Sequence, residues 1–475
     1  MIKTLLLSLI TTTLLLSQES SENNITKLSE DPLFSASRSV GLSLHDALNR
    51  SIEVSPKIEA AKAVVIQDKM RVEESFSGHL PIVNISGDGG YEARDIREDI
   101  NTNPAAITQH QKYKKVDLYL TISENLWSGG AIENGIDSKE ASLKASLYDY
   151  RDKLEALVVE TATAYFELVY SEIALKIAQK NMQSYEKILQ IVSAKEKSGA
   201  ATKGDVNFIR ANVDNAKTDY VQKQKAKQDA LAKYNYLLQG QTGEMLPYEV
   251  ETQLYMSDIN TSLKDAHTYN APLLRQNAYI EATRYNFLAS QEKFHPTVDF
   301  SINAESRNDF DEGLGKREKI NALITFNYNL YNGGKDEAAA TRLLASMQEQ
   351  NFLKQELERK LVFDIKVLNQ SVSSLADSLK LTEKEVLAAR EVVKSYWISF
   401  QHGTQDLQAL QLAQRNLNRA EQDYATYKRN LILDNFELMR KSGVLLKFLE
   451  INFSDNAESF QEARDIFSKY YSLSF

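Results

Sequence analysis

The chain has 475 residues, no cysteine and a formal net charge of −9. The missing cysteine excludes disulfides, thiol catalysis, cysteine-ligated metals and an acylated N-terminal cysteine. The acidic balance, without any stripe dominated by lysine and arginine, argues against binding to nucleic acid. The length alone favours two or three domains, while only 7 prolines and 18 glycines interrupt the sequence, which favours long helices.

The N-terminal stretch MIKTLLLSLITTTLLLSQES combines one early lysine with an apolar run over residues 5–16. That run is too short to span a bilayer, and we therefore expect residues 1–17 to be a Sec signal peptide and the mature chain to be exported. A polar N-terminal tail is expected over residues 18–39. No later stretch is apolar over the roughly 18 residues that a membrane helix needs.

Two similar phrases, LWSGGA at 126–131 and LYNGGK at 330–335, mark a repeat. Gly199 follows Gly130 by 69 residues, and Gly403 follows Gly334 by the same interval. Similar starts, LSLHDAL and TSLKDAH, precede both halves. A fixed order of landmarks written twice indicates a tandem duplication. We assign repeat 1 to residues 40–240, a linker to 241–261, repeat 2 to 262–446 and a C-terminal tail to 447–475.

Each repeat begins its patterned part with a β-hairpin, predicted at about 81–127 and 296–331. Apolar residues alternate with polar ones along these segments, which is the period of a strand with one apolar face. The clearest alternations are Val116, Leu118, Leu120 and Ile122 in the first repeat, and Ile320, Ala322, Ile324, Phe326 and Tyr328 in the second. Short helices near 55–74 and 271–292 lead into the strands.

After each pair of glycines the apolar spacing becomes three and four, as in a coiled coil. The pattern predicts long helical hairpins over 131–240, with its tip at Gly199, and over 335–446, with its tip at Gly403. The first helix of each hairpin would be on the order of 100 Å long. The predicted class is thus a mixed α and β protein.

Four strands cannot close a barrel, and open strand edges cannot be left in lipid. Three copies of the chain would supply twelve strands, an even number within the range of outer-membrane barrels. The six helical hairpins of such a homotrimer could continue the barrel as an α-helical cylinder. The predicted product is a tube that contacts outer-membrane lipid and extends into the periplasm.

The duplicated starts, the LWSGG and LYNGG junctions, and the segments SGAATKGDV and HGTQDLQAL resemble the TolC-type outer membrane efflux proteins over roughly residues 40–446. The resemblance implies a trimeric 12-stranded β-barrel joined to a periplasmic α-helical barrel. It implies a passive exit duct for efflux or type I secretion, not an enzyme. Its implied partners are a periplasmic adaptor (membrane fusion protein) and an inner-membrane ABC or RND pump.

The resemblance also assigns site residues. The hairpin tips would receive the adaptor through Gly199, Ala200, Ala201, Thr202, Gly403, Thr404 and Gln405. Asp205 matches an aspartate that latches the closed tip, although an ordinary aspartate at a helix N-terminus explains it equally well. Phe400, Gln405, Ala409 and Leu412 replace the polar latch and acidic ring of well-known members. We therefore expect Phe400 and Leu412 to hold the tip closed by apolar packing.

The strand-to-helix junctions carry an aromatic residue suited to a membrane interface and two glycines that permit a change of backbone period. These residues are Trp127, Gly129, Gly130, Tyr331, Gly333 and Gly334. The six histidines lack metal-ligand spacing, and no nucleophile or phosphate-binding motif is present. We expect no cofactor, no bound metal and no active site.

A periplasmic coiled-coil adaptor or scaffold is the alternative, since it would share the helical hairpins and the signal peptide. Adaptors place their hairpin once, between lipoyl-like and β-barrel modules, and lack strand pairs before each hairpin. The C-terminal YYSLSF alternates like a closing barrel strand, but a fifth strand would spoil the count of twelve, so a peripheral periplasmic tail is preferred. Cargo, whether protein, drug or metal, stays open.

Overall fold

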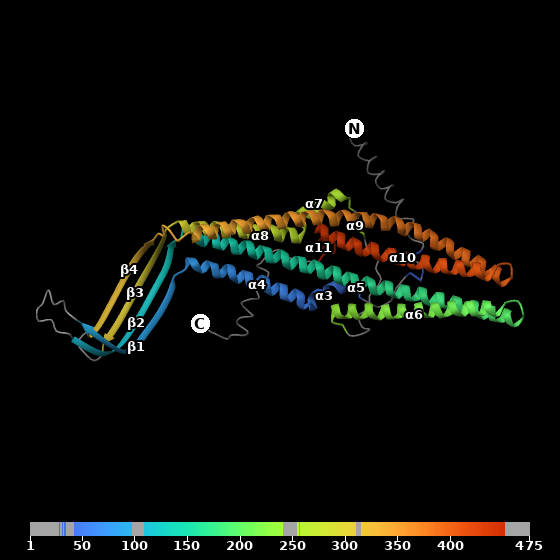
Figure 1. The fold of residues 1–475 in the computed structure, drawn as a ribbon, viewed down its shortest axis with the longest axis horizontal. Coiled ribbons are helices and arrows are strands. Elements are labelled where there is room, and N and C mark those ends of the chain that lie inside the picture. Colours follow the sequence, from blue (N-terminus) through green and yellow to red (C-terminus); the bar gives the residue numbers. More distant parts are fainter. Residues whose placement is uncertain are drawn as a thin grey trace, which may run out of the picture. The chain divides into compact units, whose positions relative to one another are not determined.

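The computed structural model describes residues 28, 31, 33–34, 42–96, 109–240, 254–255, 257–309 and 315–451. The expected signal peptide, most of the two expected tails and most of the expected linker lie outside these residues. The elements, in chain order, are α3 (Leu44–Val54), α4 (Pro56–Phe76), η1 (Ser77–His79), β1 (Ile82–Ile96), β2 (Gln109–Trp127), α5 (Ala131–Lys197), α6 (Lys203–Leu238), α7 (Ile259–Tyr269), α8 (Ala271–Gln291), η2 (Glu292–Phe294), β3 (Thr297–Asp309), β4 (Gly315–Asn327), α9 (Lys335–Gln401), α10 (Leu407–Ser442) and α11 (Leu445–Phe448). Figure 1 labels the α-helices and the strands.

The helices come in pairs of equal length. The helices α3 and α7 have 11 residues each, α4 and α8 have 21, α5 and α9 have 67, and α6 and α10 have 36. Both helical hairpins were predicted, whereas the short helices α3 and α7 were not. Within the described ranges, no helix has the length and apolar character needed to cross a membrane.

The four strands form one antiparallel sheet in the order β1-β2-β3-β4, which leaves β1 and β4 at its edges (Figure 1). The register puts Ile85, Leu120, Ala304 and Ile320 in one row across the sheet, so the predicted apolar positions share one face. That face is largely exposed in the chain. The opposite face carries Asp117, whose side chain is covered by neighbouring polar groups of β2 and β3.

A β-bulge interrupts the pairing of β2 with β3 between Asn125 and Trp127. Asn125 pairs with Asp299 on the polar face, but Trp127 pairs with Val298, which belongs to the apolar face. Bulges reorient the side chain that follows them. The extra residue therefore turns Trp127 onto the same face as the apolar rows, an arrangement that simple alternation did not predict.

The chain divides into two compact units that do not coincide with the two repeats. Described residues of 1–61, 150–271 and 358–454 form unit 1, and those of 62–149 and 272–357 form unit 2. Each unit takes segments from both repeats, so the repeats are not separate domains. In unit 2, Ser138 Oγ donates to the carbonyl oxygen of Ala282 at 3.1 Å and to Asn286 Oδ1 at 2.9 Å. This contact joins the start of α5 to α8.

The core of unit 1 brings together α3, α5, α6, α9, α10 and α11 around aromatic side chains. Tyr165 is within 6.2 Å of Tyr234, and Phe166 within 6.0 Å of Phe436, measured between ring centroids. Leu28 and Phe34 are also buried in this core, and Phe34 stacks edge-on against Tyr424. Part of the segment expected to be a polar tail is thus anchored by apolar side chains.

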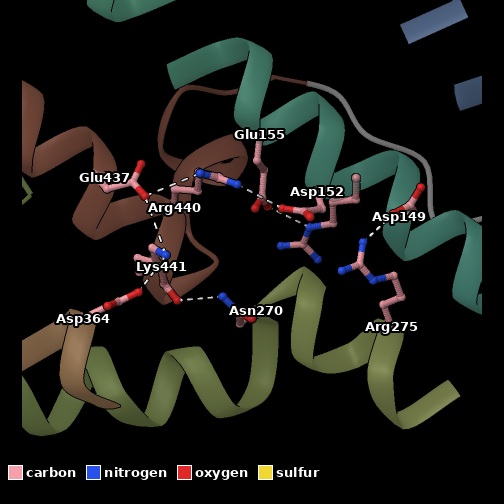
Figure 2. Close-up of polar contacts among 10 residues, drawn as sticks. Asp149, Asp152, Glu155, Asn270, Arg275, Asp364, Glu437, Arg440 and Lys441 are labelled. Carbon is pink, nitrogen blue, oxygen red and sulfur yellow. Dashed lines mark hydrogen bonds and ion pairs between the residues drawn. The ribbon is translucent and has the colours of Figure 1, made fainter. Parts of the chain in front are cut away.

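The helix α10 ends at Ser442, four residues before the predicted end at 446, because Gly443 adopts a left-handed conformation with φ +74°. Figure 2 shows the charged groups beside this end: Arg440 reaches Asp152 and Glu437, and Lys441 reaches Asp364. Asn270 Nδ2 donates to the carbonyl oxygen of Lys441 at 3.0 Å. These contacts join the end of α10 to α5, α7 and α9 within unit 1.

Glu155 is a buried acid in the same cluster, and within the described part of the chain only one of its two carboxylate oxygens accepts a hydrogen bond. Arg151 Nε donates to Glu155 Oε1 at 3.0 Å, while Glu155 Oε2 has no hydrogen-bond partner among the described residues. Burial raises the pKa of the Glu155 carboxyl to about 7, and the positive charge of Arg151 offsets this only in part. The native protein therefore holds this proton over a pH range in which the unfolded chain has lost it.

We predict that Glu155→Gln makes the stability of unit 1 less dependent on pH. Between the ordinary pKa of 4.5 and about 7, the native state binds more protons than the unfolded state, so the free energy of unfolding falls as pH rises. The full effect is about 3 kcal/mol. Chemical unfolding at pH 5 and pH 8 measures it, with Glu160→Gln, half-exposed on the same helix, as the control. Equal pH dependence in Glu155→Gln and the unmodified chain would contradict the prediction.

Candidate functional site

Both helical hairpins turn through the same backbone motif. Gly199 N donates to the carbonyl oxygen of Glu196 at 2.9 Å, and Ala200 N to that of Lys195 at 2.8 Å. In the second hairpin, Gly403 N donates to Phe400 O at 3.2 Å and Thr404 N to Ser399 O at 2.9 Å. These pairs of bonds are Schellman motifs, which require a left-handed residue after the helix. Gly199 and Gly403 supply it, with φ of +78° and +77°.

The helices that leave the tips start with different N-caps. Thr202 Oγ1 accepts from Asp205 N at 3.1 Å, and Asp205 Oδ2 accepts from Thr202 N at 2.9 Å, which together form a capping box. These hydrogen bonds hold the pKa of Asp205 below its usual range. In the second hairpin, Asp406 alone caps α10 by accepting from Ala409 N at 2.7 Å. The Asp205 carboxylate is thus engaged within its own turn, and a latching role stays a prediction.

An apolar cluster in unit 1 lies directly behind the tips and joins the two hairpins. It consists of Tyr185, Ile188, Val192, Ile209, Val213, Ala216, Phe400 and Leu410. Phe400 is only 5% exposed, whereas Leu412 is 51% exposed and is not part of this cluster. Phe400 is therefore packed behind the tips within one chain, whereas Leu412 is not. The role of either residue in closing the tip stays a prediction.

Lys195, near the tip of the first helical hairpin, contacts Phe400, near the tip of the second. Its Nζ donates to the carbonyl oxygen of Phe400 at 2.8 Å and lies 4.1 Å from the centroid of the Phe400 ring. A lysine so placed combines a charged hydrogen bond with a cation–π contact. Sequence reasoning missed Lys195, since a lysine in the last turn of a helix is ordinary and its partner lies 205 residues away.

We predict that Phe400→Ala loosens the tips locally. Truncating a buried phenylalanine leaves a cavity and removes about 3 kcal/mol or more. Because the cluster is shared, amides in 185–213 of the first hairpin should exchange hydrogen about 100-fold faster, although the substitution is in the second hairpin. Val221→Ala, a truncation at a position of α6 that is 60% exposed, is the control and should leave exchange nearly unchanged. Similar exchange in the two variants would rule out the shared cluster.

The four junction glycines all have positive φ: +72° and +101° at Gly129 and Gly130, and +61° and +78° at Gly333 and Gly334. Their surroundings differ. A Cβ on Gly129 would lie 2.9 Å from His295 Cβ and 3.1 Å from Glu292 Oε2, whereas Gly333 and Gly334 have nothing within 4 Å. Trp127 and Tyr331 are both exposed beside them. A role of these junctions in assembly stays a prediction.

The described residues contain no group of three histidine, aspartate or glutamate side chains placed to hold a metal. The geometry instead presents two tight helical turns on one apolar cluster, and a sheet with an exposed apolar face. These are features of surfaces that meet other molecules.

Comparison with known proteins places these features in a family. The sequence model of the family described as outer membrane efflux protein matches residues 47–237 and 263–444. No curated protein sequence matches significantly. Among solved structures, the Campylobacter jejuni CmeC outer membrane channel is similar with a TM-score of 0.74 at 15% identity, over 96% of each chain.

Two further structures agree. The outer membrane protein VceC from Vibrio cholerae has a TM-score of 0.73 at 16% identity, over 84% of this chain and 96% of that one. The open state of the Neisseria gonorrhoeae MtrE outer membrane channel has a TM-score of 0.70 at 15% identity, over 89% and 95%. These identities support a shared fold, and the family match covers well over half of the sequence. The chain therefore belongs to the outer membrane efflux protein family.

Proposed function

We propose that this chain is the passive outer-membrane exit duct of an efflux or type I secretion system, and acts as a homotrimer. One observation carries the proposal: a four-stranded sheet with an exposed apolar face and two edge strands, β1 and β4. In water, a sheet with exposed edge strands and an apolar face is prone to aggregation. In lipid, a β-sheet must close into a barrel, because the backbone groups of an open edge would have no hydrogen-bond partners. Three copies pairing β4 of one chain with β1 of the next would make a closed barrel of twelve strands.

The long helix α9 supports the same assembly. Large apolar side chains are exposed along most of its length, among them Phe352, Phe363 and Leu381, the last two at 65% and 68%. A protein that stayed monomeric would seldom expose so many apolar residues in one stripe. A second copy of the chain is the partner that would cover the stripe in a symmetric trimer. The hairpins would then form the periplasmic α-helical barrel.

The equal lengths of the four helix pairs support origin by tandem duplication of about 200 residues, as the repeated motifs predict. The duplication would give each chain two hairpins of strands and two of helices. A trimer would then contain six similar helical hairpins, two from each chain, arranged around its threefold axis.

In this proposal the signal peptide directs the chain to the periplasm and the trimer enters the outer membrane. The tips around Gly199 and Gly403 would dock a periplasmic adaptor and, through it, an inner-membrane ABC or RND pump. Phe400 would hold the closed tip within each chain, with Leu412 packing between chains. Since Ala409 and Leu412 replace acidic groups, single-channel conductance should respond little to calcium or pH. A strong response would contradict this apolar gate.

The test uses the absence of cysteine from the chain. Asn84→Cys on edge strand β1 is combined with Asn321→Cys, Leu323→Cys or Thr325→Cys on edge strand β4, because the register between chains is not fixed in advance. The proposal expects oxidised samples from outer-membrane vesicles to contain disulfide-linked trimers for at least one combination. Asn84→Cys with Thr121→Cys, neighbours within one chain, is the control and should form a disulfide without linking chains.

Two outcomes would overturn the proposal. One is that no combination of β1 and β4 cysteines links chains while the control disulfide forms. The other is recovery of the chain as a monomer from a periplasmic extract, which is the behaviour of an adaptor. A heat-modifiable trimer in outer-membrane vesicles would agree with the cross-links.

A further inference from the structure

The apolar face of the sheet changes character along the strands. From the end of β2 near Trp127, successive rows contain Phe300 with Ile324, then Ile122 with Ile302, then Leu120 with Ile320. Further along the same face, Tyr91 pairs with Lys114 and Ala93 with Lys112. On β4 the same face ends in Glu318 and Lys316, which form an ion pair. On β1 and β2 the apolar band ends in an aromatic residue and two lysines.

The chain's connectivity orients this band. The Trp127 end of β2 leads directly into α5, whereas the Lys112 end follows the hairpin connection of residues 97–108. If the helices extend into the periplasm, as proposed above, the lysines lie at the opposite, outer boundary of the membrane. This step rests on the proposed function.

The two lysines differ from the cation on the opposite face of the same strand. Lys115 Nζ lies within 3.5 Å of carboxylate oxygens from Asp88, Glu92 and Asp117. Lys112 and Lys114 are exposed, and neither has an ion-pair partner among the described residues. Lys114 Nζ lies 5.7 Å from the ring centroid of Tyr91, which is 83% exposed. These two charges are available to a ligand outside the chain.

We propose that Lys112 and Lys114 bind the phosphate groups of the phosphorylated glycolipid, lipid A, in the outer leaflet. A lysine beside an apolar band can bury its stem in lipid while the ammonium group reaches the headgroup. Tyr91 suits the same depth, because aromatic side chains collect at the boundary between lipid and water. The ammonium is a compact charge that pairs with phosphate. A homotrimer would present three such lysine pairs.

The experiment measures binding of diphosphoryl lipid A to detergent-purified trimer. For the double variant Lys112→Gln/Lys114→Gln, affinity should fall about 25-fold, from about fivefold for each lysine lost near an anionic lipid surface. Arg317→Gln/Lys319→Gln is the matched control, since it removes two exposed cations from the opposite face of β4. The control should bind like the unmodified trimer.

Unchanged affinity in the lysine variant, or an equal loss in the control, would overturn the inference. Equally tight binding of phosphatidylglycerol vesicles would overturn the assignment to lipid A phosphates. Heat modifiability and β1–β4 cross-linking, with the cysteine pairs introduced into the same lysine variant, are measured alongside lipid binding. If they persist while the lysine variant binds normally, the lipid site alone fails and the exit duct stands.

Discussion

Replacing Gly443 by alanine is expected to destabilise unit 1 by about 4 kcal/mol, a loss that only a few mechanisms produce. A Cβ at this position would lie 2.4 Å from the carbonyl carbon of Tyr269, 2.5 Å from its oxygen and 2.7 Å from Asn270 N. All three are backbone atoms, which cannot move aside as the end of a side chain can. The positive φ of +74° adds strain for any residue with a Cβ.

The surroundings prevent an easy relaxation of this contact. Arg151 Nη2 donates to the carbonyl oxygen of Gly443 at 2.9 Å. Asn270 Nδ2 donates to the carbonyl oxygen of Lys441 at 3.0 Å, as Figure 2 shows. Shifting the end of α10 away from α7 would break hydrogen bonds to partly buried groups. The substitution therefore lowers stability in either case, through a steric clash if the backbone stays in place and through lost hydrogen bonds if it moves.

Gly403→Ala provides the control, because Gly403 has nearly the same φ of +77° but nothing within 4 Å of the added Cβ. It should cost only the left-handed strain, about 1 kcal/mol. Unfolding midpoints in a denaturant series compare the two variants. If the Gly443 variant lost no more stability than the Gly403 variant, contact with α7 would not be the reason for this glycine.

Local patterns were sufficient to predict the strands and the long helices. Alternation along β2 and β4 is a property of each strand, and the register confirms that the apolar positions share a face. The junction at Trp127 shows the limit, since a bulge depends on pairing between strands. No period within β2 alone could indicate it.

Contacts between distant segments were not predictable in the same way. Lys195 meets Phe400 because the two helical hairpins pack together in unit 1, and the end of α10 meets Tyr269 because α7 packs against α10 in the same unit. The burial of Leu28 and Phe34 was not predictable either, because the segment around them is mostly polar, yet both side chains lie in the core of unit 1. Gly443 could have been noticed as a helix terminator, although the close approach of Tyr269 could not.

The junction glycines should affect trimer formation unequally. Valine at all four positions is expected to yield misassembled trimers, but single alanine substitutions separate the causes. Gly129→Ala should destabilise its junction by about 3 kcal/mol, since the added Cβ meets His295 Cβ at 2.9 Å and the carbonyl oxygen of Glu292 at 3.3 Å in addition to a φ of +72°. Gly333→Ala, with φ +61° and open space, should cost about 1 kcal/mol.

The measurement is the fraction of chain recovered as heat-modifiable trimer from outer-membrane vesicles. We expect a clear loss for Gly129→Ala and a nearly normal fraction for Gly333→Ala. The order matters because both glycines occupy corresponding places in the two repeats, so a role in the turn alone would make their effects equal. Equal effects would therefore show that the left-handed backbone conformation alone decides assembly. A larger loss of trimer for Gly129→Ala would show that the contact between the first junction and the end of η2 decides it.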